Sequence, residues 1–133
     1  MDIIDKIALL YIQDGKILST RSKGKDKYYI PGGKRETGET DNETLIREIK
    51  EELSVDIIED SIKYYGTFTA QAHGKAERIL VKMTCYNGEF TGQLKADSEI
   101  AEIVWLTYKD KESISPVDKL IFDDLYSKGL IKY

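Results

Sequence analysis

Hydrophobic residues recur with two different periods along this chain, and the first stretch predicts paired strands. Residues 6–13 are mostly apolar, and Asp14-Gly15 separates them from a second strand-like run at residues 16–21. Two such runs joined by an Asp-Gly dipeptide predict a β-hairpin. After a polar loop, residues 28–30 predict a further short strand that leads into Pro31-Gly32-Gly33.

The next segment, residues 40–53, changes to the period of an α-helix, about 3.6 residues per turn. Thr40 is expected to be the N-cap, and Glu43 to complete a capping box. Ser54 follows at a position where glycine is favoured, because the backbone turns left-handed there. The apolar stripe of this helix consists of Leu45, Ile46, Ile49 and Leu53.

Strand-like segments return after this helix. Residues 62–71 and 78–86 are rich in β-branched and aromatic side chains and together predict a second hairpin. Residues 98–106 predict a last strand.

A closing helix is expected from residue 116 to about residue 128. Ser115 is its predicted N-cap, Pro116 occupies the first turn, and Asp118 is expected to complete a capping box. The order of strands, helix, strands and helix predicts an α/β or α+β fold, with helices packed on a sheet.

The composition of the chain indicates how many domains it forms and which partners are improbable. The chain has 133 residues, of which 41% are hydrophobic and 33% charged, and its net charge is −4. These values predict one domain over residues 1–133, and the acidic balance argues against duplex nucleic acid as a partner. The longest apolar run, residues 7–12, is too short to span a membrane, and residues 1–6 lack the pattern of a secretory signal. A cytoplasmic location is expected, as a monomer or a homodimer.

Three carboxylates are concentrated on one side of the helix at residues 40–53. At the helical repeat, Glu48, Glu51 and Glu52 fall on a band beside the apolar stripe. Like charges at these spacings each destabilise a helix by about 0.2–0.5 kcal/mol, and partial burial would raise their pKa values. Mg²⁺ or Mn²⁺ would remove both penalties, because such hard ions bind carboxylate oxygens together with substrate phosphates. A solvated acidic surface is the alternative explanation.

Residues 33–55 carry a motif that favours the metal site. In order, it consists of Gly33, five residues, Glu39, seven residues, Arg47-Glu48, Ile49, one residue, Glu51-Glu52, one residue, Ser54 and Val55. This spacing resembles the Nudix box of the Nudix hydrolases. Every fixed position but one matches, since Ser54 stands where the family usually has glycine, and that difference removes no ligand.

The resemblance implies both a fold and a metal site. It implies an αβα sandwich with a mixed sheet, in which Glu48, Glu51 and Glu52 hold Mg²⁺ or Mn²⁺ with the carbonyl of Gly33. Glu51 or Glu52 would also act as the general base, and the sequence does not separate the two roles. The implied chemistry is attack of water on a phosphoanhydride, which depends on positioning and charge neutralisation.

Other residues receive supporting roles from the same resemblance. Arg47 would orient a glutamate, and Glu39 would brace the loop that contains Gly32. Arg21 resembles an arginine that many family members carry near substrate phosphate, although a surface position on a strand explains it equally well. Tyr29 is one of several tyrosines that could contact the base of a nucleotide, with packing in the core or on a strand as the alternative.

Residues 98–106 resemble a second recurring segment of the family, in which a glutamate approaches the metal and can act as base. Glu99 is the first candidate for this role and Glu102 the second, with ordinary strand-edge charges as the alternative. Trp105 in the same segment is expected to pack in the core, because a single tryptophan in an apolar run usually supplies buried area.

The reaction implied by the resemblance is hydrolysis of a nucleoside diphosphate linked to another moiety. The short chain is most similar to the MutT type, which converts nucleoside triphosphates, unmodified or oxidised, to monophosphate and pyrophosphate. ADP-ribose, nucleotide sugars and dinucleoside polyphosphates are alternative substrates. A Nudix domain that only binds nucleotide would usually have broken Arg-Glu or Glu-Glu positions, which are whole here. A prenyl-diphosphate isomerase would need a catalytic cysteine, for which Cys85 in an alternating strand is a poor candidate.

Overall fold

The computed structural model describes residues 2–72 and 78–133 of the chain. Its first half contains β1 (Asp2–Leu10), β2 (Ile12–Gln13), β3 (Lys16–Ser22), β4 (Gly32–Lys34) and α1 (Asp41–Leu53). Its second half contains β5 (Asp56–Ile57), the 3₁₀ helix η1 (Glu59–Ser61), β6 (Lys63–Gln71), β7 (Ile79–Asn87), β8 (Phe90–Thr91), β9 (Ile100–Leu106), the 3₁₀ helix η2 (Tyr108–Ser113) and α2 (Pro116–Ser127). Neither α1 nor α2 has the length and apolar character needed to cross a membrane.

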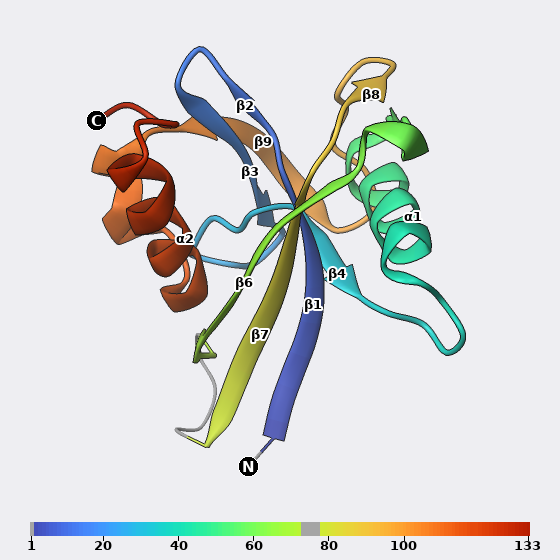
Figure 1. The fold of residues 1–133 in the computed structure, drawn as a ribbon, viewed down its shortest axis with the longest axis horizontal. Coiled ribbons are helices and arrows are strands. Elements are labelled where there is room, and N and C mark those ends of the chain that lie inside the picture. The colour runs from blue at the N-terminus through green and yellow to red at the C-terminus, as the bar shows by residue number, and fades with distance from the viewer. Residues whose placement is uncertain (1, 73–77) are drawn as a thin grey trace.

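The strands form a mixed four-stranded sheet and an antiparallel three-stranded sheet. In the order β4-β1-β7-β6, β1 runs parallel to β7 and antiparallel to β4, and β6 runs antiparallel to β7. The second sheet has the order β2-β3-β9, and β5 pairs with β8. The strands lie between α1 on one side and α2 on the other (Figure 1). The predicted αβα sandwich with a mixed sheet is therefore confirmed.

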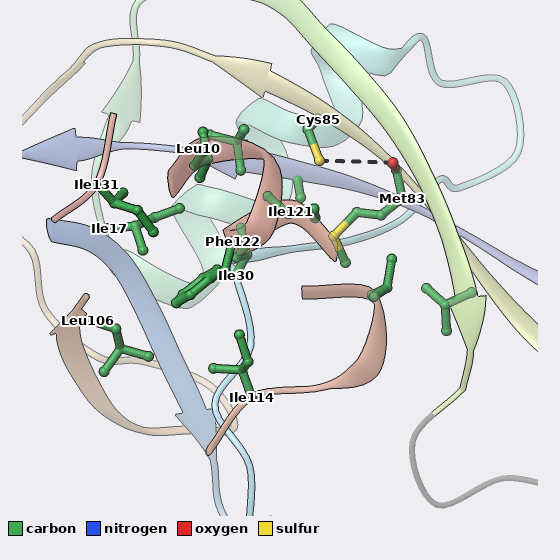
Figure 2. Close-up of a cluster of buried hydrophobic side chains, with 14 of the residues drawn as sticks. Leu10, Ile17, Ile30, Met83, Cys85, Leu106, Ile114, Ile121, Phe122 and Ile131 are labelled. Carbon is green, nitrogen blue, oxygen red and sulfur yellow. Dashed lines mark hydrogen bonds between the residues drawn. The ribbon is translucent and has the colours of Figure 1, made fainter. Parts of the chain in front are cut away.

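Alternation along β1 divides the apolar side chains between two cores. Ile7 and Leu9 pack with the apolar stripe of α1, while Ala8 and Leu10 belong to the core on the α2 side. Figure 2 shows this second core, in which Phe122 of α2 is fully buried. Full burial of each large apolar side chain contributes about 1.5–3 kcal/mol. The first core fixes α1 against β1, and this contact sets the position of the helix carboxylates.

The predicted strand at residues 28–30 is wrong. Tyr28 and Tyr29 each make a single bridge, to Ile114 and Thr20 respectively. The segment therefore connects β3 to the residues before α2 without joining a sheet. Its aromatic content favoured a strand, but the segment pairs with β3 at Tyr29 alone, so no ladder forms.

A strand forms instead at Gly32–Lys34, within the segment that the sequence predicted as a loop. Glycine is rare in strands, but Gly32 pairs with Ala8 of β1 at close range. With φ at 149°, a Cβ atom on Gly32 would lie 2.0 Å from the carbonyl oxygen of Ile7. The absence of a side chain is what permits β4 to pair with β1.

Helix α1 begins and ends as its sequence predicts. Thr40 Oγ1 accepts a hydrogen bond from the Glu43 amide (3.1 Å), and Glu43 Oε1 accepts one from the Thr40 amide (2.8 Å). At the other end Ser54 adopts the left-handed conformation, with φ 64° and ψ 24°. Its hydroxyl donates to the carbonyl oxygen of Lys95 (3.2 Å), so serine makes a contact here that glycine would lack.

Replacing Ser54 with glycine should change the free energy of unfolding by less than about 1 kcal/mol. Relief of left-handed strain, about 1–2 kcal/mol, is offset by loss of a hydrogen bond worth about 0.5–1.5 kcal/mol. The matched variant Ser54→Ala keeps the strain and loses the bond, so it should be less stable than the glycine variant. Urea denaturation of the three proteins measures both effects. An alanine variant as stable as the glycine variant would show that position 54 carries no left-handed strain.

Helix α2 starts at Pro116 as predicted, but Asp118 does not complete a capping box. The N-cap Ser115 makes no side-chain capping bond. Asp118 is fully buried, where its Oδ2 accepts a hydrogen bond from the Ile30 amide (2.8 Å) and its Oδ1 has no partner within the described chain. A buried amide must find an acceptor, and Asp118 supplies it for Ile30.

Candidate active site

The carboxylates of α1 reach the sheet at β4, its glycine-containing edge strand. Glu52 Oε1 accepts a hydrogen bond from the Gly32 amide (3.2 Å). Glu48 lies so close to Gly33 that a Cβ atom there would be 2.4 Å from the carboxyl group. The side-chain-free backbone of β4 therefore gives these carboxylates the space to lie against the sheet.

Arg47 organises the acidic groups around the helix. Its Nε and Nη2 atoms donate to the two oxygens of Glu39 (2.7 and 2.9 Å), a bidentate contact that is among the stronger ion pairs. Its Nη1 atom donates to Glu48 (3.0 Å) and Glu51 (3.2 Å). Nη2 also donates to the Lys34 carbonyl oxygen (3.0 Å), which joins α1 to β4. The Arg47 guanidinium holds the pKa of Glu39 at about 2, so this carboxylate remains charged.

A cavity of about 460 Å³ opens beside these groups, within the usual size range of small-molecule sites. The carboxylates of Glu48, Glu52 and Glu99 line one part of it. Three exposed lysines also line it, namely Lys23, Lys25 and Lys34. Its apolar wall includes Ile4, Ala8, Ile30, Val81, Met83 and Val117. The cavity thus combines acidic, basic and apolar surfaces.

Burial and mutual repulsion make two of the cavity carboxylates, Glu48 and Glu52, difficult to ionise. Burial raises the pKa of Glu52 to about 8; the charges of Glu48 and Glu99 add to this effect, and the Gly32 amide opposes it. Burial also raises the pKa of Glu48, against the opposing effect of Arg47. A cation in the cavity would relieve this repulsion.

Comparison with protein families gives a match over most of the chain. A model described as the NUDIX domain matches residues 5–125. The chain belongs to the Nudix family. This membership confirms the predicted enzyme class, a Nudix pyrophosphohydrolase. The assignment of residues 33–55 as its Nudix box remains a prediction.

Individual Nudix proteins resemble the chain in sequence and structure. YvcI of Bacillus subtilis (strain 168), described as an uncharacterized Nudix hydrolase, is 29% identical over 112 residues, which cover 83% of this chain and 71% of that protein. The MutT protein of Methanosarcina mazei Go1 is 18% identical with a TM-score of 0.77, covering 96% of both chains. The ORF135 protein of E. coli is 23% identical with a TM-score of 0.73, covering 96% of this chain and 91% of that chain. The two structures share the fold of this chain.

Nudix hydrolases generally use divalent metal ions, and the donor groups of this chain fit such an ion. Glu48, Glu52 and Glu99 offer the oxygen ligands that Mg²⁺ and Mn²⁺ prefer. Within residues 2–72 and 78–133, no three acidic, histidine or cysteine side chains converge as a complete ligand set. A hard ion here would therefore take part of its coordination from substrate oxygens or water, as Mg²⁺ commonly does.

Glu51, the third predicted metal ligand of the Nudix box, does not line the cavity. Its side chain is 50% exposed, and its carboxylate accepts the hydrogen bond from Arg47. Gly33 does line the cavity, beside Glu48. The roles of Glu51 and of the Gly33 carbonyl as ligands remain predictions.

The structure separates the two glutamates predicted near β9. Glu99 lines the cavity with the α1 carboxylates. Glu102 instead accepts hydrogen bonds from Arg21 Nε (3.0 Å) and the Tyr28 hydroxyl (2.7 Å). Arg21 is likewise absent from the cavity lining, so the structure does not bring it to the expected phosphate position. Of these residues, only Glu99 lies where a role in the reaction is available to it.

The two aromatic residues considered in the sequence, Tyr29 and Trp105, lie in different places: one lines the cavity and the other packs against a core. Tyr29 lines the cavity and is half-buried, so it remains a candidate for contact with substrate. Trp105 packs against the α1-side core and lies 6.0 Å from the ring of Tyr11, away from the cavity lining. Its predicted structural role agrees with this position.

Sequence reasoning gave no place at the cavity to two charged residues, Lys6 and Asp118. Lys6 lines the cavity from β1, and the signal for it was a charged position within the apolar alternation of Ile4, Lys6 and Ala8. Asp118 lies buried beside the cavity wall, where it holds Ile30. Its signal was its spacing of three, four and seven positions before Ile121, Phe122 and Leu125, which places it on the buried face of α2.

Replacing Gly33 with alanine should lower kcat/KM by about 10- to 100-fold, the range typical when the groups that orient metal ligands are disturbed. The new methyl group would collide with the Glu48 carboxyl group, while the backbone conformation at position 33 tolerates a side chain. Steady-state kinetics and thermal melts measure the two effects separately. The matched control is Gly66→Ala in β6, where a Cβ atom would have no contact shorter than 3.4 Å. Full activity in Gly33→Ala would show that the position of Glu48 is not required.

Proposed function

We propose that this protein hydrolyses nucleoside triphosphates to nucleoside monophosphates and pyrophosphate, with Mg²⁺ or Mn²⁺ as cofactor. The observation that carries the proposal is the combination of carboxylates, exposed lysines and an apolar wall in one cavity. A nucleoside triphosphate has complementary parts. Its phosphates suit the lysines and a carboxylate-held cation, and its base suits the apolar wall and Tyr29.

The residues of the Nudix box have distinct roles in this proposal. A bound metal ion would neutralise the phosphates and lower the pKa of water. Glu48 and Glu52 would hold that ion, and Arg47 fixes Glu48 through its hydrogen bond. The position of Glu51 outside the cavity supports Glu52 as the residue that accepts a proton from the attacking water. Glu99 is the second candidate for this proton transfer.

A substrate panel tests the proposal. The protein would be incubated with Mg²⁺ or Mn²⁺ and with unmodified and oxidised nucleoside triphosphates, dinucleoside polyphosphates, nucleotide sugars and ADP-ribose. Phosphate and pyrophosphate would be assayed separately, and nucleotide products would be separated by chromatography. Equal amounts of monophosphate and pyrophosphate from triphosphates are the expected result.

The other outcomes separate the alternatives. Activity confined to ADP-ribose, nucleotide sugars or dinucleotides would overturn the triphosphate as substrate and leave the chemistry in place. Release of inorganic phosphate instead of pyrophosphate would overturn the assigned cleavage position. No turnover across the panel, with metal and nucleotide bound, would indicate a domain that binds nucleotides without hydrolysing them.

A further inference from the structure

Lys6 is a charged residue on an apolar face of the sheet. The residues of β1 that share this face include Ile4 and Ala8, and those opposite them on β7 are Val81, Met83 and Cys85. Ile4, Lys6, Ala8, Val81 and Met83 all line the cavity. An apolar residue at position 6 would continue the wall, so the lysine requires an explanation.

The described residues around Lys6 do not neutralise it by direct contact. Its ammonium group lies 5.7 Å from the centre of the Tyr29 ring, and it forms no ion pair within the described chain. Burial lowers the pKa of Lys6, while the more distant carboxylates of Asp118, Glu52 and Glu48 oppose this effect. Partial burial of a cation without a hydrogen-bonded partner is unfavourable. Lys6 therefore presents N–H donors inside the cavity that no group of residues 2–72 and 78–133 accepts.

The chemistry of these surroundings indicates which part of a nucleotide Lys6 would meet. The exposed lysines Lys23, Lys25 and Lys34 already offer positive charge to the phosphates. Lys6 instead has apolar neighbours and the face of Tyr29 beside it, which is a surface suited to a flat heterocycle. A donor at this place would pair with an acceptor on the edge of the base.

We propose that Lys6 donates a hydrogen bond to a carbonyl oxygen of the nucleobase and so selects keto-bearing bases over adenine. Guanine, cytosine and uracil each carry such an oxygen, and adenine carries none. This inference rests on the proposed function, whose substrate it specifies. A charge-assisted hydrogen bond in a partly buried site favours the matching base by about 10- to 100-fold.

Kinetics with four nucleotides test the inference. kcat and KM would be measured for GTP, CTP, UTP and ATP with wild-type protein and with Lys6→Met, Lys6→Gln, Lys34→Met and Lys16→Met. Wild type should prefer the three keto nucleotides, and Lys6→Met should raise their KM by about 10- to 100-fold while leaving the KM of ATP nearly unchanged. Lys6→Gln keeps a neutral N–H donor and should recover part of the preference.

The control variants separate base recognition from general charge. Lys34 lies opposite Lys6 in the β1–β4 pair and lines the same cavity, so Lys34→Met should raise the KM of all four nucleotides alike. Lys16, exposed on β3 and outside the cavity lining, should have no effect. Lys6→Met should also melt at a higher temperature than wild type, because it removes a partly buried charge.

Several results would overturn the inference. A wild-type preference for ATP would do so, and so would a Lys6→Met variant that changes all four nucleotides equally. If the wild type hydrolyses none of them, the proposed function fails. Calorimetric titration of wild type and Lys6→Met with the same four nucleotides then tests whether Lys6 recognises the base. Equal loss of affinity for ATP and for keto nucleotides in Lys6→Met would reject base recognition in that case as well.

Discussion

Replacing Glu52 with glutamine should lower kcat by about 10²- to 10⁴-fold, the usual range for loss of a general base, and leave the fold intact. Glutamine is nearly the same size and keeps an oxygen for the hydrogen bond from the Gly32 amide (3.2 Å). It cannot accept a proton from water, and it brings no negative charge to hold a cation. Steady-state kinetics with a triphosphate and Mg²⁺ measure kcat, and circular dichroism checks the fold.

The stability of this variant should move in the opposite direction to its activity. Burial raises the pKa of Glu52 from 4.5 to about 8. Its contribution to stability is therefore complete below about pH 4.5 and is lost as the pH rises through 8. A neutral glutamine avoids this loss, so Glu52→Gln should melt at a higher temperature than wild type at pH 9.

A second carboxylate provides the matched control for Glu52→Gln. Glu59 in η1 is exposed and lies outside the cavity lining, so Glu59→Gln should keep both the turnover and the melting temperature of the wild type. Turnover of Glu52→Gln close to that of wild type would show that the reaction does not require the Glu52 carboxylate. A lower melting temperature at pH 9 would show that the ionised carboxylate stabilises the fold.

The first turn and the end of α1 could be predicted from sequence because their determinants are local. Thr40 and Glu43 cap each other across three positions, and the apolar stripe repeats within one helix. The left-handed conformation of Ser54 follows from its place directly after the last turn. Interactions between near neighbours of this kind do not depend on the rest of the fold.

The features that the sequence did not predict depend on contacts between distant segments. Strand β4 forms because β1 lies beside it and Gly32 permits the approach. Asp118 bonds to Ile30, 88 positions earlier in the chain, so a capping box was the better local explanation. Periodicity placed Glu51 with the other helix carboxylates. It could not show that Glu51 accepts a hydrogen bond from Arg47 and lies outside the cavity lining.

The two missed charges, Lys6 and Asp118, show where the cavity wall departs from an ordinary core. Each lies among apolar side chains, and each influences the pKa of the other without a direct ion pair. Natural proteins commonly retain such unfavourable groups at functional sites, at a cost to stability. For Asp118 this cost can be measured through its dependence on pH.

Asp118→Asn should stabilise the protein above pH 7 by an amount on the order of 4 kcal/mol. Burial raises the pKa of Asp118 from 3.8 to about 7, although the Ile30 amide and Lys6 favour the charged form. In wild type the contribution of this group is complete below about pH 4 and is lost as the pH rises through 7. Asparagine resembles the protonated carboxyl group, keeps an acceptor for Ile30 and does not ionise.

Urea denaturation at pH 5 and pH 8 measures this effect as a difference between two pH values. The stability gain of Asp118→Asn should be larger at pH 8 than at pH 5, whereas Asp60→Asn, at an exposed position in η1, should show no such difference. Some pH dependence should persist in Asp118→Asn, because burial also raises the pKa values of Glu48 and Glu52. An equal effect of Asp118→Asn at both pH values would mean that Asp118 is already ionised in the folded protein at pH 5, as it is in the unfolded chain, and that burial does not raise its pKa.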